Sequence, residues 1–259
     1  MNILKRFFVL FFMTAVFSLT ACRSGSSTMN KEASAYRLQI AASLIKGGNY
    51  PEAYKELQSA LIDDPENPYV NANLGFVCFM RDRYELSEKY YLEAIRLKPD
   101  FTDAKNSLAS LYLETLRLSK AESLIKEAVE DLSYPSYQKT YANYGILEFK
   151  KKNYPQAIMH FKKSLQKDRE NCNTLTYLGR ALTEAGDLNE ALPQLDKAIT
   201  FCSQADSDEG HYYSAIALYR NHQADSALAR FEEVIKLFPE GKNVEKSRKM
   251  IEFIRNGTP

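Results

Sequence analysis

The sequence predicts an all-α protein, a right-handed superhelical solenoid of six helical hairpins followed by a C-terminal capping helix. The first observation behind this prediction is an internal repeat of 34 to 36 residues that runs through most of the chain. The second is the i, i+3, i+4, i+7 spacing of apolar residues on both sides of each expected turn, which is typical of amphipathic helices. The third is composition, because 45% hydrophobic residues with only 10 Gly and 9 Pro in 259 residues suit a folded helical protein.

The N-terminus predicts a lipoprotein signal peptide. Lys5 and Arg6 precede the apolar run Phe7–Leu19, which is shorter than the ~20 residues of a membrane-spanning helix but typical of a signal-peptide core. The run ends in Leu19-Thr20-Ala21-Cys22, which resembles a bacterial lipobox, where the signal is cleaved before the cysteine and the cysteine is acylated. We therefore expect residues 1–21 to be removed and Cys22 to carry covalent lipid. The alternative is an ordinary cleavage site between small residues, at which Cys22 has no role.

The residues after this cysteine predict a protein anchored in the outer membrane. Arg23 stands where Asp retains lipoproteins in the inner membrane in enterobacterial-type sorting, so we expect the protein at the periplasmic face of the outer membrane. Three acyl chains anchor firmly, since two chains already give stable membrane binding. Residues 22–33 are rich in Ser and lack apolar periodicity, which predicts a flexible lipidated tether.

The repeat is defined by three sets of positions in constant phase. Small residues recur every 34 or 36 residues, each followed four positions later by a large apolar residue and preceded twelve positions earlier by a second small residue. The three sets are Ala53, Ser87, Ala121, Ala157, Ala191 and Ala227, then Leu57, Tyr91, Ile125, Phe161, Leu195 and Phe231, and then Ala41, Gly75, Ala109, Gly145, Gly179 and Ala215. This pattern resembles the tetratricopeptide repeat (TPR), whose unit is a helical hairpin. The resemblance implies six such units.

The phase of these positions also sets the expected boundaries. We expect units at about 34–67, 68–101, 102–137, 138–171, 172–207 and 208–241, with a capping helix and tail at 242–259. Turns such as Lys46-Gly47-Gly48-Asn49 divide each unit into two helices. The two 36-residue intervals place two-residue insertions around Ser133-Tyr134-Pro135 and Asp206-Ser207-Asp208. One hairpin cannot bury both of its faces alone, so stacking supplies the core and an open end needs a cap.

Residues that carry chemistry are sparse, and we predict no enzyme, no metal site, no cofactor besides the lipid and no small-molecule substrate. His160, His211 and His222 have no ligand-like spacing, and no nucleophile, P-loop or metalloprotease motif occurs. The 34 Lys and Arg balance 33 Asp and Glu, so nucleic acid is not an expected partner. The runs Lys150-Lys151-Lys152 and Asp206-Ser207-Asp208-Glu209-Gly210 are predicted to be solvated polar turns.

Secretion makes the cysteines relevant, because the compartment can be oxidising. Cys78 lies inside an apolar run, where a buried thiol behaves as a small hydrophobic residue. Cys172 opens the first helix of the fifth unit and Cys202 ends its second, and these two ends lie side by side in an antiparallel hairpin. The sequence therefore predicts a Cys172–Cys202 disulfide, with two reduced thiols as the alternative.

A narrower resemblance covers the middle of the chain. It rests on five consecutive segments: Asn106-Ser107-Leu108, Ala121-Glu122-Ser123-Leu124, Leu132-Ser133-Tyr134-Pro135, Asn143-Tyr144-Gly145 and Ala157-Ile158-Met159-His160-Phe161-Lys162-Lys163-Ser164-Leu165. With the lipobox and the six units, these segments resemble the type IV pilus biogenesis and stability family of lipoprotein pilotins. The resemblance implies a scaffold that binds secretin subunits and promotes their outer-membrane localisation and multimer assembly. The alternative is another periplasmic TPR lipoprotein, an adaptor for cell-wall enzymes or for outer-membrane protein assembly.

The resemblance to TPR arrays also implies where a partner binds, because the first helix of each unit lines the concave face. At the inward positions units one and two are apolar, with Leu38, Ala42, Ile45, Tyr69, Ala72, Phe76, Phe79 and Met80. Unit five is polar at the same positions, with Asn173, Thr176, Arg180, Thr183 and Glu184. An apolar concavity of this kind suits an amphipathic segment of a partner. The alternative is that the tether, a neighbouring helix or a second copy covers this face.

Overall fold

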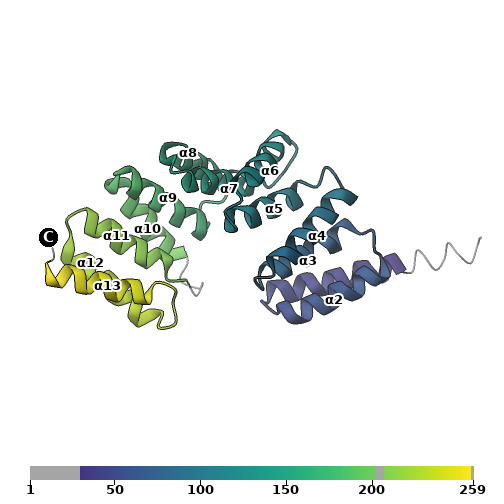
Figure 1. The fold of residues 1–259 in the computed structure, drawn as a ribbon, viewed down its shortest axis with the longest axis horizontal. Helices are drawn as coiled ribbons and strands as arrows, with labels where there is room; N and C mark the ends of the chain where they lie inside the picture. Colours follow the sequence, from purple (N-terminus) through teal and green to yellow (C-terminus); the bar gives the residue numbers. More distant parts are fainter. Residues whose placement is uncertain (1–29, 202–206, 258–259) are drawn as a thin grey trace, which may run out of the picture. The chain divides into compact units, whose positions relative to one another are not determined.

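A computed structural model describes residues 30–201 and 207–257 of the chain, and all regular structure in that part is helical. The predicted signal peptide, Cys22, Arg23 and Cys202 lie outside the described residues. The helices are residues 30–46, α2 (Tyr50–Asp63), α3 (Pro68–Phe79), α4 (Tyr84–Leu97), α5 (Thr102–Glu114), α6 (Leu118–Glu130), α7 (Tyr137–Lys150), α8 (Tyr154–Leu165), α9 (Cys172–Ala185), α10 (Leu188–Phe201), α11 (Glu209–Arg220), α12 (Ala224–Leu237) and α13 (Val244–Asn256). Successive helices pair as hairpins along the chain (Figure 1). The predicted all-α array of hairpins is confirmed, and its right-handed superhelical winding stays a prediction.

Every hairpin turns through one residue in the left-handed backbone region. These residues are Gly48, Asp82, Leu116, Lys152, Gly186 and His222. Their φ angles run from 56° at Asp82 to 85° at Gly186, and they recur with the 34- and 36-residue intervals of the repeat. In each turn the N–H of the following residue donates to the carbonyl five residues earlier, at 2.8 to 3.0 Å. This bond is the signature of a Schellman motif, which ends the first helix and satisfies one of its last carbonyls.

Small residues let the two helices of a hairpin approach closely. A side-chain Cβ at Gly75 of α3 would lie 2.7 Å from the Tyr91 ring of α4, closer than real Cβ contacts allow. The same meeting of glycine and large side chain joins Gly145 to Phe161 and Gly179 to Leu195. The repeat positions found in the sequence are therefore the contact points of the hairpins, where burial of apolar surface stabilises the fold.

The contacts divide the chain into two compact units, one ending at Leu111 and the other beginning at Tyr112, within α5. In the first unit a core cluster joins helix 30–46 to α2 and α3. Its fully buried members are Ala41, Ala53, Leu57, Ala60, Val70, Leu74 and Val77. Helix α3 begins at Pro68, where the Asn67 carboxamide oxygen accepts from the backbone N–H groups of Tyr69 and Val70 at 3.0 and 3.3 Å. Such capping satisfies donors that the first turn leaves without partners.

In the second unit the core continues from hairpin to hairpin and ends under α13. Met250, Ile251 and Ile254 of α13 pack against a cluster that contains the buried Phe231. Asp208 fixes the approach of this last helix, since its carboxylate accepts from the backbone N–H of Asn243 at 2.6 Å and from its side chain at 2.8 Å. The polar run around Asp208 is thus not simply a solvated turn, because Asp208 is buried and anchors the cap.

Candidate functional site

The predicted partner-binding residues of the first unit divide into packed and exposed ones. Phe76 packs against the core cluster, and its ring centroid lies 6.4 Å from that of Tyr50 on α2. Leu38 and Ile45 of the first helix pack against the same cluster. Phe76 therefore contributes to the core, and only part of its side chain is left to contact a partner. Periodicity assigns a residue to a helix face but does not reveal that a neighbouring helix already covers part of that face.

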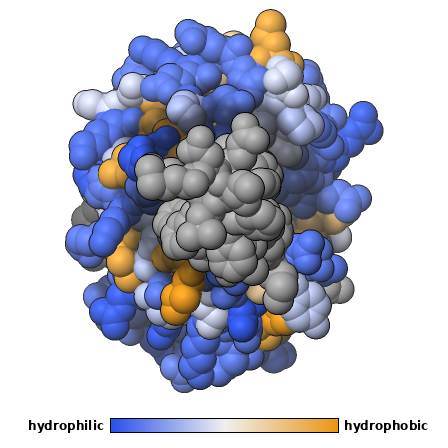
Figure 2. Space-filling model, turned by 90° about the vertical axis from the view of Figure 1, so that its right-hand side faces the viewer, coloured by the Kyte–Doolittle hydropathy of each residue, from blue (hydrophilic) through white to orange (hydrophobic). Residues whose placement is uncertain are grey.

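The exposed members of the set are Ala42, Tyr69 and Met80, and the side chains of Tyr69 and Met80 are 46% and 42% exposed. Phe79 is half-buried, with its ring centroid 5.9 Å from that of Tyr84, and Ala72 is half-buried as well. Figure 2 shows one face of the molecule, on which the coloured surface is mostly hydrophilic with separate hydrophobic spots. On the coloured part of this face, hydrophobic residues are therefore separate from one another and do not form one continuous apolar patch.

Tyr69 belongs to a small aromatic and cationic group at the start of α3. Its ring meets Phe101 edge-on at a centroid distance of 5.0 Å, and the Lys98 ammonium donates to its hydroxyl at 3.0 Å. The same ammonium lies 5.2 Å from both ring centroids. The hydrogen bond raises the pKa of Lys98, so the site presents a positive charge beside two rings at neutral pH.

Two of the five inner positions of unit five are buried threonines. The hydroxyls of Thr176 and Thr183 are buried and donate to carbonyls of their own helix, at 3.0 Å to Cys172 and 2.8 Å to Gly179. Asn173 and Glu184 are exposed. Hydroxyls that donate to the preceding helical turn are satisfied locally, so these two buried threonines do not use their hydroxyl protons to bind a ligand.

Arg180 lies between aromatic rings of three helices. Its guanidinium carbon is 4.9 Å from the ring centroid of Phe149 on α7, 4.7 Å from Tyr177 on α9 and 4.0 Å from Tyr213 on α11. Burial raises the pKa of both tyrosines. Sequence reasoning placed Arg180 among polar ligand-facing residues and missed this packing, because the rings come from different hairpins. Stacking of a guanidinium on desolvated rings makes Arg180 a structural tie between α7, α9 and α11.

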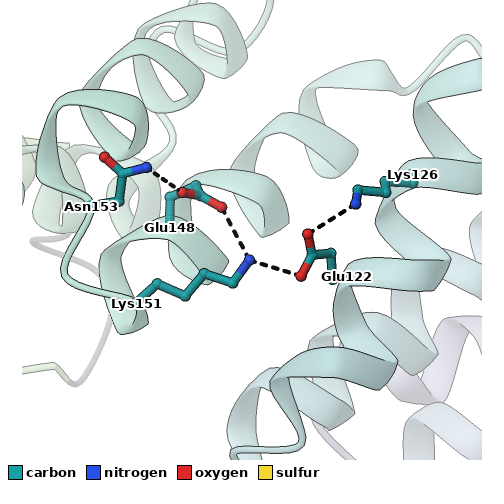
Figure 3. A network of polar contacts seen from close by, with 5 residues as sticks. All are labelled: Glu122, Lys126, Glu148, Lys151 and Asn153. Atoms are coloured by element: carbon teal, nitrogen blue, oxygen red, sulfur yellow. Dashed lines mark hydrogen bonds and ion pairs between the residues drawn. The ribbon is translucent and has the colours of Figure 1, made fainter.

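Lys151 bridges two hairpins, although its lysine run was expected to be a solvated turn. Its ammonium lies 2.8 Å from Glu122 of α6 and 3.5 Å from Glu148 of α7, as Figure 3 shows. Lys126 also pairs with Glu122 at 3.0 Å, and Asn153 donates to Glu148 at 2.7 Å. Hydrogen bonds from the two lysines, Lys151 first, lower the pKa of Glu122. A network of this kind is worth more than an isolated surface pair.

Cys78, Cys172 and His160 occupy the surroundings of structural residues. Cys78 is a free, buried thiol whose pKa is raised by burial. Cys172 is disulfide-bonded, and Cys202 lies outside the described residues, so their pairing stays a prediction. His160 is buried and stacks on Tyr144 at a centroid distance of 3.9 Å. Burial lowers the pKa of His160, which favours its neutral form.

Over residues 30–201 and 207–257, no three His, Cys, Asp or Glu side chains are placed to hold a metal ion. In the same residues no helix is both long and apolar enough to cross a membrane. Among the exposed side chains described above, Tyr69 with Lys98 and Met80 are of the aromatic, cationic and apolar types that are enriched at protein–protein interfaces.

Comparison with known proteins places the chain among repeat proteins. A model of the tetratricopeptide repeat matches residues 38–101, and a model of the TT21 fifth ARM repeats domain matches residues 142–253. The type IV pilus assembly protein PilF of Pseudomonas aeruginosa is 28% identical over 132 residues, which are 51% of this chain and 52% of PilF. Superkiller protein 3 of Schizosaccharomyces pombe is 24% identical over 200 residues, 70% of this chain and 14% of that protein. The chain thus spans about half of PilF and a smaller part of the second relative.

Solved structures share the fold. The PilF structure of Pseudomonas aeruginosa superposes with a TM-score of 0.70 at 19% identity, over 88% of this chain and 99% of that one. The structure of PilW, a widely conserved type IV pilus biogenesis factor, gives a TM-score of 0.71 at 19% identity, over 82% and 97%. Proteins of this repeat class are typically non-enzymatic modules for protein interaction. The chain is therefore similar to tetratricopeptide-repeat proteins, and it has the fold of the pilus factors PilF and PilW.

Proposed function

We propose that the protein is an outer-membrane lipoprotein of the pilotin type, which binds secretin subunits and promotes their localisation and multimer assembly for type IV pilus biogenesis. The observation that carries this proposal is the similarity to PilF. It combines 28% identity over half of the chain with the same fold over 99% of the solved PilF chain. PilF is a pilus assembly protein, and the lipobox at Cys22 supplies the membrane attachment that a pilotin needs.

The anchor supports a role in delivery. A lipid on Cys22 and a tether of residues 22–33 would hold the helical array close to the membrane and leave its surface free. A partner captured on that surface would travel to the same membrane. This reasoning gives the lipid a function beyond attachment, because a pilotin without its anchor would still bind the secretin but would not deliver it.

The binding surface that we favour consists of the exposed Ala42, Tyr69 and Met80 and the half-buried Phe79 of the first unit. Side chains of this size are typical anchors for an amphipathic segment of a partner. Lys98 beside Tyr69 adds a positive charge, so the partner segment should carry a carboxylate at one end of its apolar face. Phe76 is left out of this set because it packs against the core.

The first experiment tests function and anchoring separately. Deletion of the gene should abolish SDS-resistant secretin multimers in the outer membrane. Cys22→Ser should leave the protein present but no longer fractionating with that membrane. Normal multimers in the deletion strain would refute the pilotin role and favour the adaptor alternative. A serine variant that is still acylated and bound to the outer membrane would refute the lipobox interpretation alone.

The second experiment tests the surface. Met80→Glu should abolish multimer assembly without altering circular dichroism or protein level, because Met80 is 42% exposed and a carboxylate buried under a partner costs several kcal/mol of binding. The matched control is Asn173→Glu, which adds the same charge at an exposed position of α9. Equal assembly in the two variants would show that the secretin binds elsewhere.

A further inference from the structure

The insertion between α6 and α7 forms a pocket. A cavity of about 240 Å³ opens here, and its walls include Asp131, Leu132, Tyr134, Tyr137, Tyr141 and Lys163. Tyr134 is only 7% exposed, so the extra residues of this long repeat build a wall rather than a loose loop. The loop is fixed locally, because the Asp131 carboxylate accepts from the backbone N–H of Ser133 at 3.1 Å and from its hydroxyl at 2.6 Å.

An unused apolar side chain stands at the rim of this pocket. Leu132 lines the cavity yet is 97% exposed, and Tyr137 beside it is 37% exposed. The fold gains no burial from Leu132, since almost all of its surface is in water. Single exposed apolar residues are ordinary, but one placed at the mouth of an aromatic cavity is positioned to cover whatever enters it.

Two lysines place positive charge around the same cavity. The Lys163 ammonium donates to the Tyr141 hydroxyl at 2.8 Å and lies 4.1 Å from the centre of that ring. The Lys167 ammonium donates to the carbonyl of Pro135 and lies 5.2 Å from the centre of the Tyr137 ring. Among the residues that the structure describes, neither lysine forms an ion pair with a carboxylate. Their charges are held in place by rings and a carbonyl, and Asp131, the one carboxylate in the pocket wall, accepts from Ser133 instead.

We propose that this pocket, formed by residues 128–141 and Lys163, binds an aromatic or large aliphatic side chain of a partner protein whose neighbouring residues are acidic. The volume of the pocket indicates a single side chain as its occupant. About 240 Å³ is below the ~300–1,000 Å³ of small-molecule sites but suits one anchoring side chain. Lys163 and Lys167 outnumber the single wall carboxylate, Asp131, so charge complementarity favours a partner that brings carboxylates next to its anchoring side chain. The proposal rests on the second unit alone and does not require the pilotin role.

The test uses a photocrosslinking peptide, blocked at both ends, with the sequence Gly-Asp-X-Asp-Gly, where X is benzoylphenylalanine. Mass mapping on the full mature chain should place the crosslinks on residues 128–141. Leu132→Asp and Lys163→Glu should each lower the crosslink yield about fivefold or more, through lost contact and reversed charge. Both residues are exposed, so unchanged circular dichroism should accompany the loss.

Two controls separate the outcomes. Lys197→Glu makes the same charge change at an exposed position of α10 and should leave the yield unchanged. A peptide with Asn in place of both Asp residues should crosslink about fivefold less. Crosslinks scattered over other helices, or equal yields in all variants, would overturn the proposal. A dimer in sedimentation that Leu132→Asp converts to monomer would also overturn it, by showing that a second copy occupies the pocket.

Discussion

Adding a single methyl group at Gly75 should separate α3 from α4. The Cβ of an alanine there would lie 2.7, 2.8 and 2.9 Å from Cδ1, Cε1 and Cγ of Tyr91. Tyr91 is 2% exposed, so the ring has little room to retreat. The Ser87 hydroxyl also donates to the Gly75 carbonyl at 2.7 Å, which ties the two helices at the same level. Overpacking in such a core costs about 1–3 kcal/mol.

The expected net effect is smaller than the clash, because alanine favours a helix over glycine by about 1 kcal/mol. Gly75→Ala should therefore lower the free energy of unfolding by about 1 kcal/mol. Tyr91→Ala removes the obstructing ring altogether, whereas leucine would not, because a Cβ at the equivalent Gly179 would lie only 2.4 Å from Leu195. In that background Gly75→Ala should raise the free energy of unfolding by about 1 kcal/mol, since only the helix preference remains.

Urea unfolding followed by circular dichroism measures all four corners of this double-mutant cycle. The coupling energy between the two positions should be about 2 kcal/mol, within the range for residues in direct contact. The sign reversal is the decisive result. A Gly75→Ala variant that is more stable in both backgrounds would refute the idea that close approach of the helices requires glycine here.

Three further predictions concern the second unit. Gly186→Ala should lower the free energy of unfolding by about 1–2 kcal/mol although nothing lies near its Cβ, because φ is 85°; an unchanged urea midpoint would contradict this. Non-reducing mass mapping should recover Cys172 and Cys202 in one linked peptide, and two alkylated thiols from native periplasm would exclude the bond. The lowered pKa of Glu122 means that its contribution to stability is present above its unfolded pKa of about 4.3 and is lost as the pH falls through the folded value. Lys151→Met should therefore destabilise at pH 7 in low salt but much less at pH 3, and an equal loss at both would refute the ion-pair account.

The hairpins could be predicted from sequence because their determinants repeat. Ala53 and its equivalents locate the second helix of each hairpin, and the small residue twelve positions earlier locates the first helix. The turns could be placed by glycine only at Gly48 and Gly186, whereas Leu116 and Lys152 adopt the same backbone without glycine. Their conformation follows from the repeat as a whole, since the Schellman bond and the packing of both helices impose it.

The binding surface was harder to predict, because it depends on which apolar faces neighbouring helices cover. Phe76 lies in α3 and Met80 directly follows this helix, and both are apolar. Phe76 nevertheless packs against the core, whereas Met80 is 42% exposed. Arg180 has no local signal for its aromatic surroundings, since Phe149 and Tyr213 lie more than 30 residues away in each direction. Contacts of this kind depend on tertiary packing and cannot be read from the hydrophobic periodicity of the sequence.

The constant geometry of the hairpins has a consequence for how such a chain can change. In every hairpin 16 residues separate the small residue of the first helix from the large residue of the second, as from Ala41 to Leu57 or from Gly145 to Phe161. The longer intervals gain their residues outside the hairpin, and one of these connections, residues 131–136, carries the pocket. Descendants of this chain can therefore acquire new recognition surfaces by lengthening connections while leaving each hairpin untouched. The same connections are the natural places to graft a foreign loop.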